Sequence, residues 1–256
     1  MYKDILYEIT QSVCIITLNR PEVYNAINEN IANELYKAIV DASQDENVRA
    51  IVLTGSGKAF CSGADLKVDN NNSFGEILRN RYNPIILVIR NMSKPIICKL
   101  NGIAVGAGSS LALACDMIIA SDEASLSQIF INIGLIPDAG SSFFLPRLIG
   151  AAKTFELFST GRKVSAKEAF DIGLINKVVP SADLDSATLT LATHYANTPT
   201  VAISLIKKLI NKSFNSSLEE MLETEAEFQD LAGNTDDFRE GVKAFLEKRK
   251  PEFKGK

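Results

Sequence analysis

The chain has 256 residues, of which 46% are hydrophobic and 23% charged, a balance that allows one large domain with a substantial core. Its formal net charge of -4 leaves no excess of Lys and Arg to attract nucleic acid, so we expect no nucleic-acid partner. His194 is the only histidine, which argues against a histidine-based nucleophilic triad and a histidine-rich metal site.

The cysteines and the apolar stretches indicate the cellular compartment of the protein. The four cysteines stand in apolar or glycine-rich runs without C-x-x-C spacing, which predicts reduced, buried thiols: Cys14, Cys61, Cys98 and Cys115. The first ten residues carry charges where a signal peptide needs an apolar run. The apolar stretch 103–115 ends at Asp116 and is too short to span a bilayer. These features predict a cytoplasmic protein with no membrane partner.

Strand-like and helix-like segments alternate through the first two thirds of the chain. Apolar runs predict strands over 13–18, 50–55, 95–100 and 117–121, and helical periodicity begins at Ile27. Further helices are expected near 83–92 and over 109–116, and the Asn-rich stretch 67–76 is expected to be a loop. Beyond Gly150 the pattern is helical almost to the end, with capping signatures at 165–168 and 217–220. We therefore expect an α/β core over 1–195 and a helical region over 196–256.

Two loops of small residues stand out, "FCSGADL" at 60–66 and "VGAGSS" at 105–110. Glycine lets backbone N–H groups approach a ligand closely, and the second loop leads into a predicted helix whose first N–H groups are free. Two such groups on one carbonyl oxygen would form an oxyanion hole. The alternative is close packing between a helix and a strand. Gly106 and Gly108 have no third glycine at dinucleotide-binding spacing.

Asp138 follows a proline and precedes a nearly uncharged run in "GLIPDAGSSFFLPRLIG". It could cap the helix predicted after it, because Asp is a favoured N-cap residue. It could instead be a catalytic acid or base. Its neighbours would form an apolar wall that raises the pKa of a carboxylate: Ile136, Ala139, Phe143 and Phe144.

Five segments in this order resemble the crotonase family of enoyl-CoA hydratases and isomerases: "NRPEVYNA", "GKAFCSGADL", "KLNGIAVGAGSSLALACD", "IGLIPDAGSSFFLPRLIG" and "FLEKRKPEFKGK". Within the family they are most similar to the ring-1,2-epoxyphenylacetyl-CoA isomerases of phenylacetate breakdown. The resemblance implies an α/β fold, a crotonase-like spiral of ββα units with a C-terminal helical trimerisation region. It also implies an acyl-CoA substrate, no cofactor other than the coenzyme A of that substrate, and a homotrimer or dimer of trimers.

The resemblance also assigns residues to the site. The oxyanion-hole amides would be those of Ala64 and Ala107. Residues expected to contact substrate or coenzyme A are Ser62, Asp65, Leu66, Gly106, Ser110 and Phe130, with Phe245 and Lys248 reaching the coenzyme A of a neighbouring subunit. The segment 67–91 would shape the acyl pocket, and for Tyr82 and Asn83 within it a pocket contact and a surface position both remain open.

One departure from the family pattern bears on the reaction. Hydratases of the family use two glutamates, and the matching positions here hold Ser110 and Phe130. Each lost acid–base role would cost about 10²–10⁴-fold, so hydration is disfavoured. Asp138 stands where some isomerases of the family place a working aspartate, and one carboxylate suffices for a 1,3-proton shift. We expect an isomerase, with a hydratase, an acyl-thioester decarboxylase or a non-catalytic acyl-CoA-binding subunit as alternatives.

Overall fold

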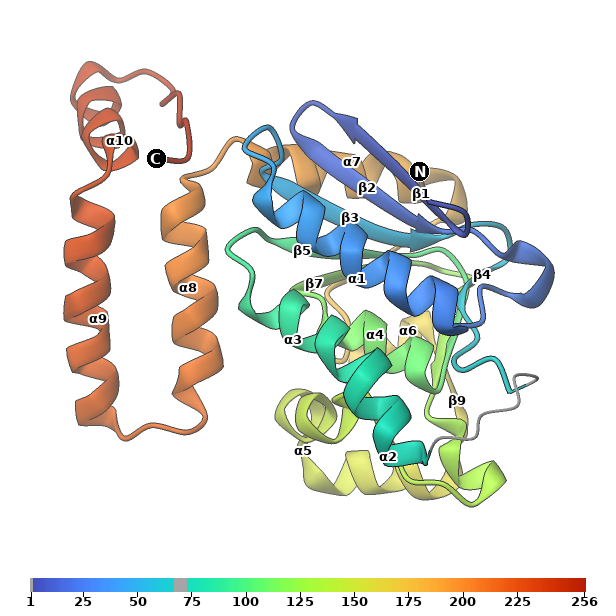
Figure 1. Cartoon of the computed structure of the whole chain (residues 1–256). Coiled ribbons are helices and arrows are strands. Elements are labelled where there is room, and N and C mark those ends of the chain that lie inside the picture. The colour runs from blue at the N-terminus through green and yellow to red at the C-terminus, as the bar shows by residue number, and fades with distance from the viewer. Residues whose placement is uncertain (1, 67–72) are drawn as a thin grey trace.

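The computed structural model describes residues 2–66 and 73–256, in which two sheets are surrounded by helices (Figure 1). The larger sheet has six strands in the order β1-β2-β3-β5-β7-β10. The smaller sheet has four in the order β4-β6-β8-β9. The strands are β1 (Ile5–Thr10), β2 (Val13–Leu18), β3 (Ala50–Gly55), β4 (Ala59–Cys61), β5 (Ile96–Leu100), β6 (Ile103–Val105), β7 (Met117–Ser121), β8 (Ser125–Ser127), β9 (Lys163–Ser165) and β10 (Lys177–Val179).

The helices alternate with pairs of strands in the first half of the chain and follow one another at the C-terminal end. They are α1 (Glu29–Gln44), α2 (Phe74–Ile77), α3 (Asn83–Asn91), α4 (Ala107–Ala114), α5 (Ser141–Thr160), α6 (Ala166–Asp171), α7 (Leu184–Ala196), α8 (Thr200–Ser213), α9 (Leu218–Gly233) and α10 (Asp236–Glu247). Short helical turns are η1 (Pro21–Val23), η2 (Leu78–Tyr82), η3 (Ile129–Ile133) and η4 (Ser181–Asp183), of which η2 has π-helical geometry. From β3 to β8 the strands come in consecutive pairs. The first strand of a pair lies in the larger sheet and the second in the smaller sheet, and a helix follows each pair, which confirms the expected ββα spiral.

The central strands of the six-stranded sheet, such as β3 and β5, are buried on both faces. Alternate side chains of a strand point to opposite faces, so Ile51 and Leu53 pack with α1 in one core cluster. Ala50 and Val52 pack with α7 in a second cluster on the other face. Continuous apolar runs such as β2 and β3 therefore suit this sheet, where they pair in parallel. The predicted strands 13–18, 50–55 and 117–121 match the observed ones, and the fourth begins one residue late.

Other expectations were wrong at particular segments. The N-terminal strand β1 was not predicted, although it pairs antiparallel with β2 through a two-residue turn in which Gln11 and Ser12 have positive φ. Beyond Gly150 the chain is not purely helical, because β9 pairs with β8 and β10 with β7. The expected loop 67–76 contains the capping box of Ser73 and the start of α2, while its residues 67–72 lie outside the described part.

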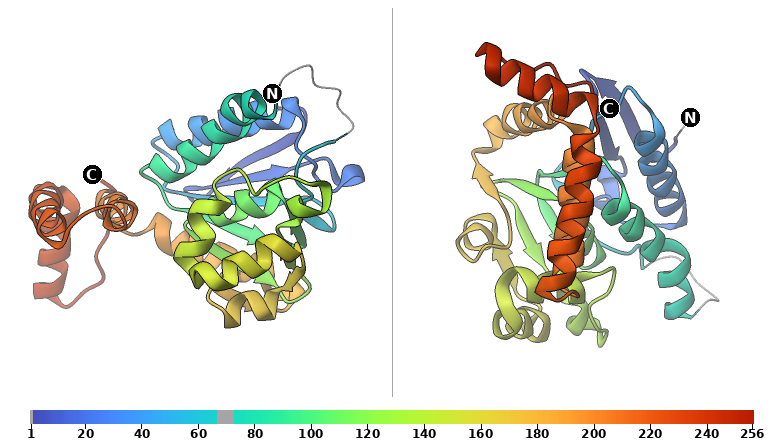
Figure 2. Two further views of the ribbon diagram at one scale, coloured as in Figure 1. Left: turned by 90° about the horizontal axis from the view of Figure 1, so that it is seen from below. Right: turned by 90° about the vertical axis from the view of Figure 1, so that its left-hand side faces the viewer.

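The C-terminal helices α8, α9 and α10 form an arm that extends from the side of the core (Figures 1 and 2). Ser217 makes the predicted capping box at the start of α9. The four cysteines are free and buried, as predicted. Across the described ranges, each helix is too short or too polar to cross a bilayer.

Candidate active site

The two small-residue loops meet at backbone contact. Gly63 has a φ of +92°, and a Cβ atom there would lie 2.8 Å from the carbonyl oxygen of Val105 and 3.5 Å from the amide nitrogen of Ala107. A Cβ atom on Gly108 would lie 2.3 Å from the carbonyl oxygen of Cys61. Only glycine allows these approaches, so close packing of the two loops accounts for Gly63 and Gly108. The same contacts bring the backbones beside Ala64 and Ala107 together.

The amide of Ala64 is left out of the local backbone pairing. An isolated parallel bridge joins Ile27 and Ala64. It is made by the Ile27 amide, which donates to Gly63, and by the Asp65 amide, which donates to Ile27. In a bridge of this kind the N–H of Ala64 points away from its partner strand. Ala64 is also exposed, so its amide can meet a ligand.

The amide of Ala107 opens α4. Ala107 is the first residue of the helix, and the first N–H groups of a helix have no partner within it. The preceding Gly106 has a φ of 52° and a ψ of -125°, which turns the chain sharply from β6 into α4. The positive end of the helix dipole therefore lies at this amide and favours a developing negative charge.

Asp138 does not cap a helix. The N-cap residue of α5 is Gly140, and no side chain caps this helix. Only the main-chain carbonyl of Asp138 takes part in the turn, where it accepts hydrogen bonds from the amide and the Oγ of Ser141. Ala139 and Gly140 both have positive φ, which separates the Asp138 side chain from the helix start. The capping explanation is thus wrong for this residue.

The carboxyl group of Asp138 is mostly buried, and its Oδ1 atom has no hydrogen-bond partner among the described residues. Burial raises its pKa to about 6, because removal from water disfavours the charged form. Such a group is still largely ionised at neutral pH and is a stronger base than an ordinary aspartate. A carboxyl group whose pKa is shifted toward neutrality, and which has no ion pair or hydrogen bond to explain its burial, is typical of a catalytic site.

Tyr82 lies close to Asp138. It ends the π-helical turn η2, is 8% exposed, and belongs to the same core cluster as Cys61 and Ala139. Burial raises the pKa of its phenol, with nearby Cys61 and Asp138 adding to the effect, so the phenol stays protonated. The surface alternative for Tyr82 is therefore wrong. The sequence left its position open because the π-helical turn alters the helical spacing that would reveal its buried face.

The two positions that lack glutamates lie beside the loops. Ser110 is fully buried and its Oγ donates to the carbonyl oxygen of Gly106 at 3.3 Å. Phe130 is 7% exposed, and its ring is the group that a Cβ atom on Gly106 would meet, at 3.7 Å. Both side chains thus adjoin the Gly106 turn. Neither can exchange a proton as a carboxylate would.

The other predicted contacts lie in two places, the 60–66 loop and the end of α10. Ser62 donates to the carbonyl oxygen of Val23, and Asp65 forms an ion pair with Arg20 at 3.0 Å. Leu66, the last residue of the loop, is 71% exposed. Phe245 and Lys248 lie in and after α10, on the arm and away from the loops of the same chain (Figure 1). Phe245 is 83% exposed.

One buried polar residue at the site was missed. Gln128 is 4% exposed, its Nε2 donates to the Oγ of Ser109 at 3.1 Å, and its Oε1 has no partner among the described residues. It precedes η3 and joins that turn to α4. No sequence pattern marks it, because a single glutamine reveals nothing of its tertiary contacts. Within the described ranges, no group of three or more His, Cys, Asp or Glu residues is arranged to hold a metal ion.

Comparison with known proteins fits this geometry. The family model for enoyl-CoA hydratase/isomerase matches residues 8–256. A "probable enoyl-CoA hydratase" from Rhodobacter capsulatus is 42% identical, covering 100% of this chain and 99% of the relative. The 1,2-epoxyphenylacetyl-CoA isomerase of Escherichia coli K12 is 38% identical and matches over 100% of both chains.

The fold comparison agrees. The crystal structure of an enoyl-CoA hydratase from Bacillus anthracis superposes with a TM-score of 0.94 at 34% identity, covering 99% of this chain and 100% of that one. The match thus extends over the loops, the Asp138 segment and the arm. The chain is an enzyme of the enoyl-CoA hydratase/isomerase family, the crotonases, a family that acts on acyl-CoA substrates.

Proposed function

We propose that this enzyme is an acyl-CoA isomerase that moves a proton between carbon atoms of its substrate through a thioester enolate. Asp138 would be the only acid–base group. The observation that carries the proposal is the state of its carboxyl group, which is buried, has an Oδ1 atom without a partner among the described residues, and has a pKa raised to about 6. The Asp138 side chain does not cap α5, so capping does not account for a carboxylate at this position.

In the proposed reaction, the thioester oxygen accepts hydrogen bonds from the amides of Ala64 and Ala107. Asp138 removes a proton from one carbon, and the electron pair left behind moves to the thioester oxygen as an enolate. Hydrogen bonds aimed at that oxygen stabilise the charge as it develops. Asp138 then returns the proton to another carbon, so atoms and charge balance. The proposal needs no cofactor beyond the coenzyme A carried by the substrate.

Two isomerisations fit this scheme. One is a shift of a double bond from the Δ3 to the Δ2 position of an enoyl-CoA. The other is the isomerisation of a ring epoxide, which is supported by the name of the relative from Escherichia coli, an isomerase of 1,2-epoxyphenylacetyl-CoA at 38% identity. Both need one base and an oxyanion hole, and neither needs the two missing glutamates.

Proton exchange in heavy water, followed by NMR with 3-hexenoyl-CoA, tests the proposal. We expect Asp138→Asn to abolish exchange at the α and γ carbons while thioester binding, measured by calorimetry, is retained. Ser110→Ala is the matched control and should keep exchange within a few-fold, because a serine hydroxyl is too weak an acid and too weak a base to replace the carboxylate of Asp138. Exchange retained in Asp138→Asn would refute the assignment.

Hydration is the second candidate, since the relative from Rhodobacter capsulatus carries a hydratase name at 42% identity. Crotonyl-CoA distinguishes the two reactions. It can add water, but its double bond is already at the Δ2 position, conjugated with the thioester, so an isomerase would not shift it appreciably. Rapid water addition by the native enzyme would favour hydration. A malonyl-type thioester in the same panel tests for decarboxylation.

We further propose that the C-terminal helical region 196–256, which includes the arm of α8, α9 and α10, assembles the subunits into a trimer or a dimer of trimers. Large apolar side chains are exposed along it: Ile206, Ile210, Phe214, Leu218, Leu222, Leu231, Phe238, Val242, Phe245 and Leu246. Phe245 and Lys248 would then contact the coenzyme A of a neighbouring subunit, together with Ser62, Asp65 and Leu66 of that subunit. Light scattering of the native protein tests the subunit number.

A further inference from the structure

The first turn of α5 begins at Ser141, whose amide and Oγ donate to the carbonyl oxygen of Asp138, so this turn and the Asp138 backbone are joined. Phe143 and Phe144 lie in this turn, with their rings 5.5 Å apart and nearly perpendicular. Phe144 packs against the loop itself, since a Cβ atom on Gly140 would lie 2.7 Å from its ring. A shift of this turn would therefore move the Asp138 loop with it.

Arg147, one turn further along α5, ties this segment to the arm. Its guanidinium group lies 3.6 Å from the ring centroid of Phe143 and 5.4 Å from that of Phe214, which closes α8. Its Nη1 donates to the carbonyl oxygen of Phe143 at 2.9 Å, while its buried Nε has no hydrogen-bond partner among the described residues. The cation thus lies between one ring of α5 and one ring of the arm.

A second arginine makes a parallel connection from the core. Arg90 of α3 lies 5.7 Å from the ring centroid of Phe144 and donates to Asp116 and to Asn211 of α8. Asp116 also accepts from Lys207 of α8 at 2.8 Å. The lower part of α8 in Figure 1 faces α3 and α5, the two helices that carry these arginines. The helix that begins after Asp138 is therefore held by the arm at two rings.

We propose that Arg147 and Phe214 are positioning residues for Asp138: through them, α8 of the arm fixes the first turn of α5 and with it the place and the enclosure of the carboxylate. The inference rests on the proposed function for its catalytic consequence only. Cation–π contacts are attractive at these distances, so the two arginines favour one position of the first turn of α5. A displacement of about 1 Å at a reacting group can cost about 10²-fold in rate.

The test compares Arg147→Met, which removes the cation, with Arg147→Lys, which keeps a charge without the flat stacking surface. We expect Arg147→Met to lower kcat about tenfold with KM for the thioester nearly unchanged, and Arg147→Lys to recover part of the loss. Phe214→Leu should reproduce Arg147→Met, while Phe214→Tyr should match the native enzyme. Phe214→Leu also serves if Arg147→Met fails to fold.

A second readout needs no substrate. The pKa of Asp138, measured by carbon NMR of labelled aspartate with Asp138→Asn for assignment, should fall from about 6 toward the ordinary value in Arg147→Met and Phe214→Leu, because a loosened turn admits water. The titratable and charged groups around the Asp138–Tyr82 pair are Cys61, Asp65 and Arg81, and all are kept in these variants. If Asp138→Asn retained exchange, the proposed function would fail while this titration still tested the positioning.

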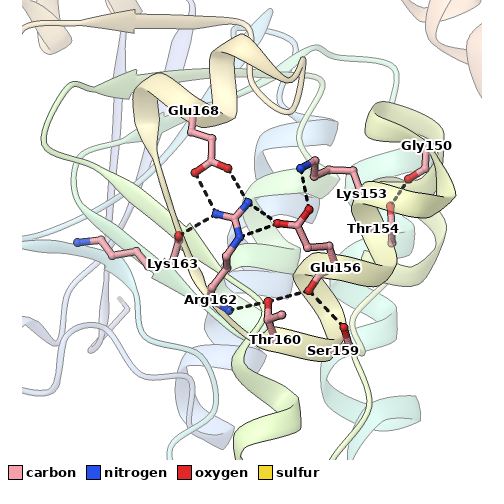
Figure 3. A network of polar contacts seen from close by, with 9 residues as sticks. All are labelled: Gly150, Lys153, Thr154, Glu156, Ser159, Thr160, Arg162, Lys163 and Glu168. Atoms are coloured by element: carbon pink, nitrogen blue, oxygen red, sulfur yellow. Dashed lines mark hydrogen bonds and ion pairs between the residues drawn. The ribbon is translucent and has the colours of Figure 1, made fainter.

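The opposite end of α5 supplies the control (Figure 3). There Arg162 donates to Glu168 at 2.6 and 3.0 Å and to Glu156 at 2.8 Å, beyond the break in the helix at Gly150. Arg162→Met should lower the melting temperature without changing kcat or the pKa of Asp138. The inference is overturned if Arg147→Met and Phe214→Leu keep both values, or if Arg162→Met shifts them equally.

Discussion

Gly63 and Val105 come so close that a Cβ atom on Gly63 would lie 2.8 Å from the carbonyl oxygen of Val105. The two loops that carry the proposed oxyanion amides are thus in backbone contact, with no side chain between them. Because one loop follows β4 and the other follows β6, the pairing of these strands in the small sheet sets the distance between the two amides.

We predict that Gly63→Ala lowers both stability and activity. The left-handed backbone costs a residue with a Cβ atom about 1–2 kcal/mol, and relief of the contact with Val105 costs a further 1–3 kcal/mol, roughly. Displacing one oxyanion donor reduces kcat about 10²-fold. Urea unfolding and the proton-exchange rate measure the two effects.

Gly134→Ala is the matched control for that variant. Gly134 also has a positive φ, but a Cβ atom there would meet nothing within 4 Å. It should therefore show the backbone cost of about 1–2 kcal/mol without the loss of rate. Equal losses of rate in both alanine variants would contradict the importance of the loop contact.

The rate should depend on pH through Asp138. The carboxyl group must be ionised to take a proton, and burial raises its pKa to about 6. We therefore expect kcat/KM for isomerisation to fall as the pH drops below about 6, and to level off above it. A rate that stayed constant down to pH 5 would show that another group is the base.

We predict that Asp138→Asn lowers activity but raises the free energy of unfolding at high pH. The pKa in the folded state, about 6, exceeds the ordinary value of about 3.9, so the folded state binds the proton more tightly. The stability gained in this way is present below pH of about 4 and is lost as the pH rises through about 6. At pH 8 the neutral amide avoids burying a charge and should stabilise the fold by about 1 kcal/mol, less than the full shift implies because the group is partly exposed.

Urea unfolding of both proteins at pH 8 and at pH 4 checks this prediction. The difference between native enzyme and Asp138→Asn should be largest at pH 8 and close to zero at pH 4. The prediction is contradicted if Asp138→Asn is less stable than the native enzyme at pH 8 and this deficit disappears at pH 4. That result would mean that the carboxylate has a stabilising partner in the folded state.

Removing Asp116 from its buried ion pair with Lys207 should cost more stability than removing Lys207. Lys207 is 6% exposed and donates to Asp116 and to the carbonyl oxygen of Ile89, and burial lowers the pKa of its ammonium group. Asp116 has other partners, since it also accepts from Arg90 and from the amide of Ile96. Asp116→Ala leaves a buried cation with no counter-ion and should cost about 3–5 kcal/mol.

Lys207→Met should cost less, about 1–2 kcal/mol, because Asp116 keeps its arginine and its amide. Chemical unfolding of the two single variants measures the difference. Equal costs would mean that Asp116 gains nothing from its remaining partners.

The end of the chain should be held by Asp237. Its carboxylate is 2% exposed and accepts hydrogen bonds from the amides of Lys254 and Gly255 at 2.6 and 2.8 Å. An amide offers one acceptor oxygen in place of two, so Asp237→Asn should cost about 1–3 kcal/mol and release the tail. Hydrogen exchange of the Lys254 and Gly255 amides reports that release.

Asp236→Asn is the neighbouring control. Asp236 has a side chain that is 72% exposed and pairs only with Arg239 on the surface, within the contacts described for it. It should change stability by less than about 1 kcal/mol. If both variants protected the tail amides as well as the native chain, the carboxylate of Asp237 would not be what holds them.

The sequence by itself determined the elements whose burial is local and continuous. The apolar runs of β2, β3 and β7 and the four-residue spacing of α1 identify them, because a strand buried on both faces and an amphipathic helix leave distinct periods. The short strands β9 and β10 have three residues each and no period of their own, so only their partners β8 and β7 define them. The two glycine loops, the absent glutamates and the family were also readable, since each depends on residue types in order along the chain.

The tertiary structure alone decided what those residues meet. It set the distance between Gly63 and Val105, removed Asp138 from the helix cap, enclosed its carboxyl beside Tyr82, and placed Arg147 between a ring of α5 and a ring of the arm. Each of these relationships joins segments far apart in the sequence or depends on how much water a group has lost. A one-dimensional pattern contains neither quantity, because burial and contact arise only when the whole chain packs.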